Sequence, residues 1–100
     1  MTKLAPVHPG EILTEEFLAP YGITRHKLAT DLGIPASRID QIARGKRSVT
    51  ADTAFRLSLY FGNSPQFWMN LQTNYDLKTM GAKLPKIRSE VRNRVNAPAA

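Results

Sequence analysis

The chain contains no cysteine among its 100 residues and only two histidines. The absence of cysteine excludes a disulfide framework, a cysteine zinc cage and a cysteine nucleophile. His8 and His26 are too few for a metal site, and we expect His8 to help start the first helix instead. No apolar run approaches the ~18 residues that a membrane span needs. The first residues carry no cleavage signature, so we expect no secretory signal.

The sequence also lacks the patterns that mark enzymes. Glu15 and Glu16 are adjacent, so on a helix they diverge and cannot form the converging carboxylate pair of acid–base catalysis. No catalytic triad, phosphate-binding loop or cofactor fingerprint is present. We therefore predict that the protein is not an enzyme, needs no cofactor and takes no small-molecule substrate. Three widely spaced aliphatic residues near the C-terminus are a weak membrane anchor, so we expect no membrane partner.

The positive charge is concentrated in two segments. The net charge is +6 and the pI is near 10.1. Residues 25–47 hold six basic and two acidic side chains, and residues 81–100 hold five basic and one acidic. An evenly solvated basic protein is one interpretation, but clustering within a 23-residue window favours a polyanionic partner.

Residues 9–80 are predicted to form short helices, because apolar residues recur at helical spacing between clear stop signals. Thr24, Thr50 and Ser64 are suited to cap helices, and Gly33 and Gly62 to end them. No strand pattern competes in this region. The five predicted helices span about 9–19, 24–33, 35–45, 50–62 and 64–80. Trp68 is predicted to anchor the core.

Residues 24–45 have the spacing of a helix-turn-helix, in which two short helices are joined by a tight turn. Ala29 is small where the two helices would cross, and Gly33 permits the turn. Ile39 and Ile42 would point into the core from the second helix. A purely structural three-helix bundle is the alternative, and the basic cluster beside the turn argues against it.

The outer face of the predicted third helix carries small and polar residues, which suits entry into a DNA major groove. Ala36 and Ser37 allow close approach to a thymine methyl or a base edge, and Gln41 can pair with adenine. Asp40 can accept from cytosine N4, and Arg38 lies on the flank, within reach of a base or the backbone. An ordinary solvated helix face is the alternative for Asp40 and Gln41.

Four basic residues around this helix are predicted to bind phosphates. Arg44, Lys46 and Arg47 follow the helix, and Arg25 begins the preceding one, where that helix would cross the DNA backbone.

Three segments carry a resemblance to a known family: "HPGEILTEEFLAPYGIT", "LGIPASRIDQIARGKRSVTADTAFRLSLYFGN" and "SPQFWMNLQTNYDL". In this order they resemble the HigA-type antitoxins, also called virulence-associated protein I, of the Xre/lambda-repressor-like helix-turn-helix class. The resemblance covers about residues 8–78. It implies an all-α, five-helix, lambda-repressor-like DNA-binding domain, which we place over residues 1–80. Residues 81–100 remain as a basic C-terminal extension that the resemblance does not cover.

The resemblance also implies a function and partners. Such a protein would be a cytoplasmic, nucleoid-associated homodimer that binds operator DNA, represses its own operon and neutralises a HigB-type toxin, a ribosome-dependent mRNA endonuclease. It assigns base reading to Ala36, Ser37, Arg38 and Gln41, and phosphate binding to Arg25, Arg44, Lys46 and Arg47. A stand-alone regulator without a toxin, and an interaction protein with vestigial DNA binding, are the alternatives.

The surplus of apolar residues over 50–80 predicts a dimer surface, since one inward face does not use them all. Phe55 and Leu59 make an outward pair, which fits either extra helix packing or a dimer, and Leu59 stands where relatives often carry a polar residue. The predicted dimer residues are Phe55, Leu59, Phe67, Met69 and Leu77. The extension over 81–100 matches no family pattern. It fits both a helix that a partner orders and a two-residue alternation, with residues 96–100 frayed.

Overall fold

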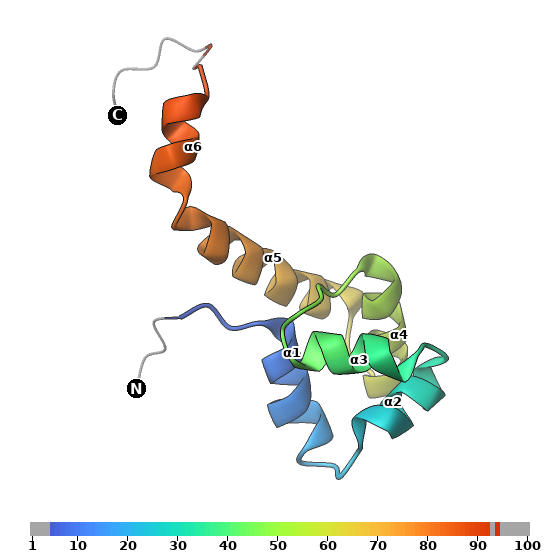
Figure 1. Ribbon diagram of the computed structural model, residues 1–100. Helices are drawn as coiled ribbons and strands as arrows, with labels where there is room; N and C mark the ends of the chain where they lie inside the picture. Colours follow the sequence, from blue (N-terminus) through green and yellow to red (C-terminus); the bar gives the residue numbers. More distant parts are fainter. Residues whose placement is uncertain (1–4, 93, 95–100) are drawn as a thin grey trace.

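The computed structural model describes residues 5–92 and 94, and within them every regular element is a helix (Figure 1). This confirms the all-α class and adds a sixth helix to the five predicted. The helices are α1 (Pro9–Ile12), which continues as the π-helical segment η1 (Leu13–Leu18), α2 (Arg25–Leu32), α3 (Ala36–Ala43), α4 (Ala51–Phe61), α5 (Pro65–Gly81) and α6 (Leu84–Glu90).

The helix ends follow the predicted capping signals. The side chains of Thr24, Thr50 and Ser64 each accept the N–H of the residue three positions later. Gly33 and Gly62 follow the ends of α2 and α4 with φ of 72° and 77°, a left-handed conformation that disfavours other residues. Local sequence therefore sets where α2, α4 and α5 begin, and where α2 and α4 end.

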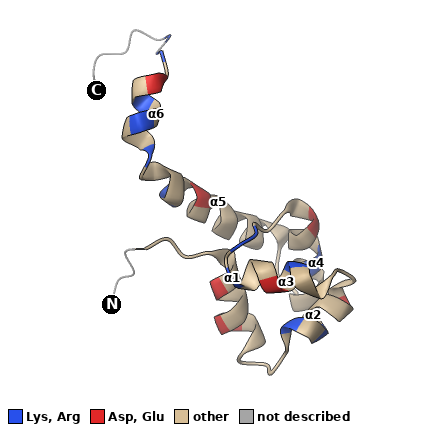
Figure 2. Ribbon diagram, in the orientation of Figure 1, with Lys and Arg blue, Asp and Glu red and all other residues tan. Residues whose placement is uncertain are grey.

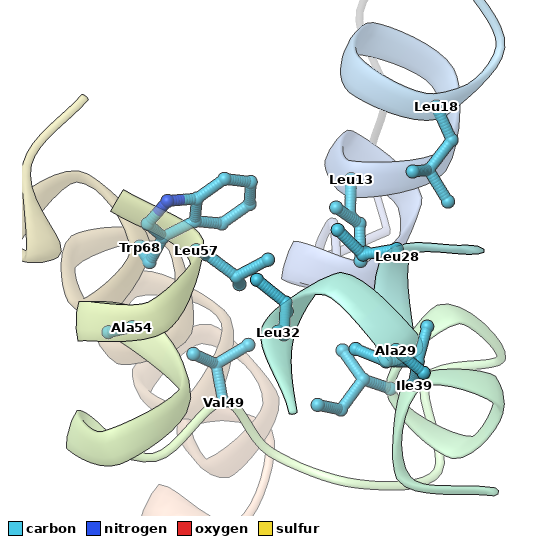
Figure 3. Close-up of a cluster of buried hydrophobic side chains, with 11 residues drawn as sticks. Leu13, Leu18, Leu28, Ala29, Leu32, Ile39, Val49, Ala54, Leu57 and Trp68 are labelled. Carbon is cyan, nitrogen blue, oxygen red and sulfur yellow. The ribbon is translucent and has the colours of Figure 1, made fainter. Parts of the chain in front are cut away.

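One hydrophobic core lies between the helices (Figure 3). Trp68 is fully buried, which confirms it as an anchor, and its indole Nε1 donates to Asn63 Oδ1 at 2.9 Å. Leu13, Leu28 and Leu57 are buried with it. Each such side chain contributes roughly 1.5–3 kcal/mol through removal from water, so the core fixes how α1, α2 and α4 sit against α5.

The helix-turn-helix consists of α2 and α3, as predicted. Ala29 is buried in α2, and Ile39 and Ile42 of α3 are fully buried. The turn is closed by a hydrogen bond from the Ile34 N–H to the Ala29 carbonyl at 3.1 Å. Pro35 is the residue before α3 rather than its first turn, so α3 is shorter at both ends than the predicted 35–45.

The end of α5 and all of α6 extend away from the core (Figure 1). No residue of α6 is buried, and Leu77 and Met80 near the end of α5 are exposed. Pro85 has no N–H to donate to the Gly81 carbonyl, which accounts for the break between the two helices. The helical interpretation of the extension is confirmed over 84–90, while residues 96–100 lie outside the described part.

Candidate nucleic-acid interface

The outer face of α3 presents its predicted base-reading residues to solvent. Ala36, Ser37 and Gln41 are exposed, while Ile39 and Ile42 on the opposite side are fully buried. The buried face therefore holds α3 in the core, and the opposite face is accessible to a partner. The small residues stand at its N-terminal end, the end that enters a major groove first in recognition helices of this kind.

Asp40 shares that outer face, but its carboxylate is already engaged. Arg25 Nη1 donates to Asp40 Oδ1 at 2.7 Å, and Arg44 Nε lies 3.0 Å from Oδ2. The hydrogen bond from Arg25 is the main cause that lowers the pKa of Asp40; burial opposes it, and the positive charge of Arg44 adds to the lowering. The structure thus differs from the sequence prediction in one respect, because Asp40 is not a free acceptor. We call Arg25, Asp40 and Arg44 the arginine clasp.

Arg38 lies on the flank of α3, as predicted. Its guanidinium is 3.9 Å from the Asp52 carboxylate at the start of α4, and its side chain is about one-third exposed. Arg38 and Arg47 line the same shallow cleft together with Ser48 and Thr50. The structure therefore brings one predicted base reader close to one predicted phosphate ligand.

The loop after α3 carries Lys46 and Arg47 at the surface, and hydrogen bonds to its backbone hold it in place. The Lys46 N–H donates to the Gln41 carbonyl at 2.8 Å. The Val49 N–H donates to Oε1 of buried Gln72 at 2.8 Å, and Gln72 Nε2 donates to Asp76 at 2.9 Å. Gln72 of α5 therefore fixes the end of a loop that lies 23 positions earlier in the chain.

His8 supports the same loop from the other side. Its Nδ1 accepts the Gly10 N–H at 2.9 Å and caps α1, which confirms the role predicted for it. Its ring packs edge-on against Tyr75 with centroids 4.8 Å apart, and lies beside Gly45. Burial lowers the pKa of His8, with Asp76 and a hydrogen bond to the Arg47 backbone opposing that shift. The acceptor role of Nδ1 and the lowered pKa both favour the neutral form of this imidazole.

Gly10 lies where α1 approaches the backbone of α3. A Cβ at Gly10 would lie 1.8 Å from the Ile42 carbonyl oxygen and 3.0 Å from the Ala43 Cα. Those atoms belong to the backbone and cannot rotate away. The HPGE segment thus has a physical role: His8 caps the helix, Pro9 starts it, and Gly10 lets it rest on the back of α3.

The predicted dimer residues divide into two groups. Leu59, Leu77 and Phe55 are exposed by 84%, 66% and 58%. Phe67 is partly committed to the aromatic cluster, since it lies edge-on to Trp68 with centroids 5.0 Å apart. Met69 is partly buried against the core, so only part of its side chain is left for a dimer contact.

Charge is distributed unevenly over the surface (Figure 2). Basic residues lie on α6 and around the loop after α3, whereas acidic residues mark the first helix. Arg44, Lys46 and Arg47 are exposed, while Arg25 is partly covered by its pair with Asp40. The phosphate-binding residues predicted from the sequence therefore flank the exposed face of α3.

Three supporting residues escaped the sequence prediction. Gln72 and Gly10 act through contacts with distant backbone, and Arg56 Nη1 donates to the Leu32 carbonyl at the end of α2 at 2.8 Å. Gln72 stands in the SPQFWMNLQ segment, so a buried glutamine among apolar residues was the available signal. In the described part of the chain, no helix is long and apolar enough to cross a membrane, and no cluster could hold a metal ion.

Comparison with known proteins supports this arrangement. Residues 15–68 match the family described as Helix-turn-helix. The chain is 53% identical over 76 residues to virulence-associated protein I of Dichelobacter nodosus, covering 76% of this chain and 70% of the relative. It is 41% identical over 76 residues to antitoxin HigA-1 of Vibrio cholerae serotype O1, covering 76% and 71%.

A solved structure shares the same fold. The Pseudomonas aeruginosa antitoxin HigA, solved with higBA promoter, superposes with a TM-score of 0.82 at 43% identity, over 90% of this chain and 99% of that one. This family comprises DNA-binding regulators and antitoxins and is not a known enzyme class. The paired helices α2 and α3, the matched residues and the superposition together show that the chain belongs to the Xre-like helix-turn-helix family, among the HigA antitoxins and virulence-associated protein I.

Proposed function

We propose that this protein is a sequence-specific DNA-binding antitoxin that represses its own operon and neutralises a HigB-type toxin by direct binding. The observation that carries the DNA-binding part is the exposed outer face of α3, flanked by Arg44, Lys46 and Arg47. The likeness to a HigA antitoxin solved with its promoter supports the same function. Acting on DNA, the protein would work in the cytoplasm, associated with the nucleoid.

Within this proposal, base reading and phosphate binding fall to different residues. Ala36, Ser37 and Gln41 are placed at base edges, because they are exposed on the helix face opposite the buried isoleucines. Lys46 and Arg47 are placed on phosphates, because their loop projects beyond the end of α3 and is held by buried contacts. Arg38 can serve either contact from the flank.

The two roles make opposite predictions for substitution. Gln41→Ala should cost roughly 1–3 kcal/mol on the best operator and relax the preference at one base pair. Lys46→Ala should weaken binding to all sequences alike and reduce the salt slope by about one unit. Anisotropy titrations on operator and random duplexes at several salt concentrations separate them. Equal losses on both duplexes for Gln41→Ala would reject it as a base reader.

We further propose that the protein binds DNA as a two-fold dimer built by residues 50–80. One helix-turn-helix reads one half-site, and a dimer places two recognition helices about one DNA turn, ~34 Å, apart. Phe55, Leu59 and Leu77 supply the exposed apolar surface, which lies outside the α3 face and its loop. Burial of Leu59 in such an interface would account for an 84% exposed leucine.

The oligomeric state can be measured by sedimentation velocity at micromolar concentration. The parent protein should sediment as a dimer, and Leu59→Lys should shift it toward monomer and weaken operator binding together. A protein that is monomeric at this concentration and still protects a single half-site would overturn the dimer. A dimer that Leu59→Lys leaves intact would overturn the placement of its interface on Leu59.

The toxin partner is tested through the neighbouring reading frame. A small toxin-like gene beside this one should arrest growth when expressed alone, and co-expression of this chain should relieve the arrest through a complex that co-purifies. If no such gene adjoins it while operator binding holds, the protein is a stand-alone regulator of the same fold.

A further inference from the structure

The arginine clasp joins two helices through one carboxylate. Asp40 stands in the middle of α3, Arg25 is the first residue of α2, and Arg44 directly follows the last turn of α3. Each oxygen of Asp40 contacts a different arginine, at 2.7 Å and 3.0 Å. The side chains of Arg25 and Asp40 are about 40% exposed and that of Arg44 about 60%, so the clasp lies at the surface, where a polyanion can reach it.

The sequence predicts that Arg25 and Arg44 both bind phosphates, and the clasp changes how they would meet DNA. A guanidinium has five N–H donors. Arg25 donates one of them to Asp40, and Arg44 is ion-paired to Asp40 through Nε. The remaining donors stay open for phosphate oxygens. Long side chains lose rotamer freedom when they bind, and a partner that orders them beforehand reduces that loss.

The same contacts argue against Asp40 as a reader of cytosine. Each of its oxygens already lies against a guanidinium: Oδ1 accepts from Arg25, and Oδ2 is ion-paired with Arg44. Turning the carboxylate toward a base would release Arg25 or Arg44 and expose a negative charge to the phosphate backbone. Held between two arginines, the carboxylate instead leaves the cluster with a net positive charge.

We infer that Asp40 is a positioning residue, which sets Arg25 of α2 and Arg44 of α3 at a fixed spacing for the DNA phosphates and reads no base. This inference rests on the proposed DNA-binding function. On this inference, Asp40 is an outward residue of α3 that contributes equally to the affinity for every DNA sequence.

The substitution Asp40→Asn tests the inference, because it removes the charge and keeps the shape. Simple electrostatics predicts tighter binding when a carboxylate is removed near a polyanion. Loss of positioning predicts binding roughly five- to tenfold weaker, since two arginine side chains must then be ordered on binding. The salt slope should shrink by about one to two units as their phosphate contacts weaken.

The binding measurement is an anisotropy titration of a duplex that carries the region upstream of the protein's own reading frame, together with its single-base-pair variants. Asp40→Asn should weaken binding to all variants by the same factor, and Asp40→Glu should recover part of the loss. A changed preference at one C·G pair would make Asp40 a base reader and overturn the inference. Unchanged or tighter binding would also overturn it.

Two matched comparisons test whether Asp40→Asn weakens DNA binding through the two arginines. In an Arg25→Ala, Arg44→Ala background, Asp40→Asn should tighten binding, because only repulsion from phosphate is left to remove. Asp31→Asn is the control, since it makes the same charge change at a carboxylate paired with Lys27 at 3.1 Å, away from α3. Weakening by Asp31→Asn as large as that by Asp40→Asn would contradict a specific role for the clasp.

A measurement without DNA separates this inference from the proposed function. In ¹⁵N NMR spectra of the free protein, the Arg44 Nε–H resonance should stand apart from those of solvent-exposed arginines, and Asp40→Asn should move it among them. If the resonance is not displaced in the parent, the clasp is absent in solution and the inference fails, whether or not DNA is bound. If the clasp is present but the parent does not prefer its upstream region, the proposed function fails, and the assignment of Asp40 to phosphate positioning fails with it.

Discussion

Replacing Gly10 by alanine should unfold this protein more easily than its size of one methyl group suggests. The added Cβ would lie 1.8 Å from the Ile42 carbonyl oxygen and 2.7 Å from the Ile42 carbonyl carbon. Both atoms are part of the α3 backbone, inside a helix whose inward isoleucines are fully buried. Relief therefore requires α1 and α3 to separate, which also disturbs the core residues between them.

The magnitude follows from the distances. Ordinary Cβ contacts begin near 3.4 Å, so the helices must part by roughly 1.6 Å at this point. Overpacking costs about 1–3 kcal/mol when side chains can adjust, and a rigid backbone neighbour places this site at or above the upper end. Alanine regains roughly 1 kcal/mol over glycine in helix propensity. A net loss of about 2–3 kcal/mol should lower Tm by about 10–20 °C.

Thermal melts followed by circular dichroism measure this loss, with Gly81→Ala as the control. Gly81 ends α5, and a Cβ there meets none of the described atoms within 4 Å. Gly81→Ala should therefore leave Tm unchanged or raise it slightly. If Gly10→Ala and Gly81→Ala melt within a few degrees of each other, α1 does not rest on the backbone of the recognition helix as described.

Two further predictions concern the core and pH. Ala29→Leu should overpack the α2–α3 crossing and lower the free energy of unfolding by about 1–3 kcal/mol. The control Ser89→Leu, on exposed α6, should change that free energy little. Equal denaturant midpoints for the two variants would refute the packing at the crossing. Burial lowers the pKa of His8 in the folded protein below its ordinary value of about 6.5, so the unfolded chain takes up a proton more readily than the folded one. The free energy of unfolding should therefore fall as the pH drops from 7.5 to 5.5. Urea melts should show that this fall shrinks in His8→Asn, which keeps a capping oxygen but does not titrate; an undiminished fall would rule out His8 as its source.

Features that depend on a few neighbouring residues were predictable from the sequence. Thr24 and Gly33 bound α2 because capping and a left-handed turn need only local residue types. The period of Ile39 and Ile42 assigned the two faces of α3 for the same reason. The outward residues Ala36, Ser37 and Gln41 followed directly from that assignment.

Features that depend on distant partners were not predictable in this way. Asp40 looked like an open acceptor because its Arg25 partner lies 15 positions away, on another helix. Gly10 reaches the Ile42 carbonyl and Gln72 reaches Val49 only once the chain has folded. Met69 seemed surplus because a helical wheel of α5 does not show how closely the other helices cover it. The spacing of apolar residues predicts whether a side chain points toward or away from the core. These contacts can be predicted only when the relative positions of the helices are known.

The way α3 is held has a consequence for how this protein can evolve. Its supports include two inward isoleucines, the pair of Asp40 with Arg25, and a glycine that lies against its backbone. None of these side chains belongs to Ala36, Ser37 or Gln41. Substitutions at those outward positions therefore leave the packing of the scaffold intact. Given the proposed base-reading role of these positions, a duplicated copy of this gene could change its target site by point mutation without first acquiring compensating changes in its core. New regulatory circuits could then diverge from one stable fold.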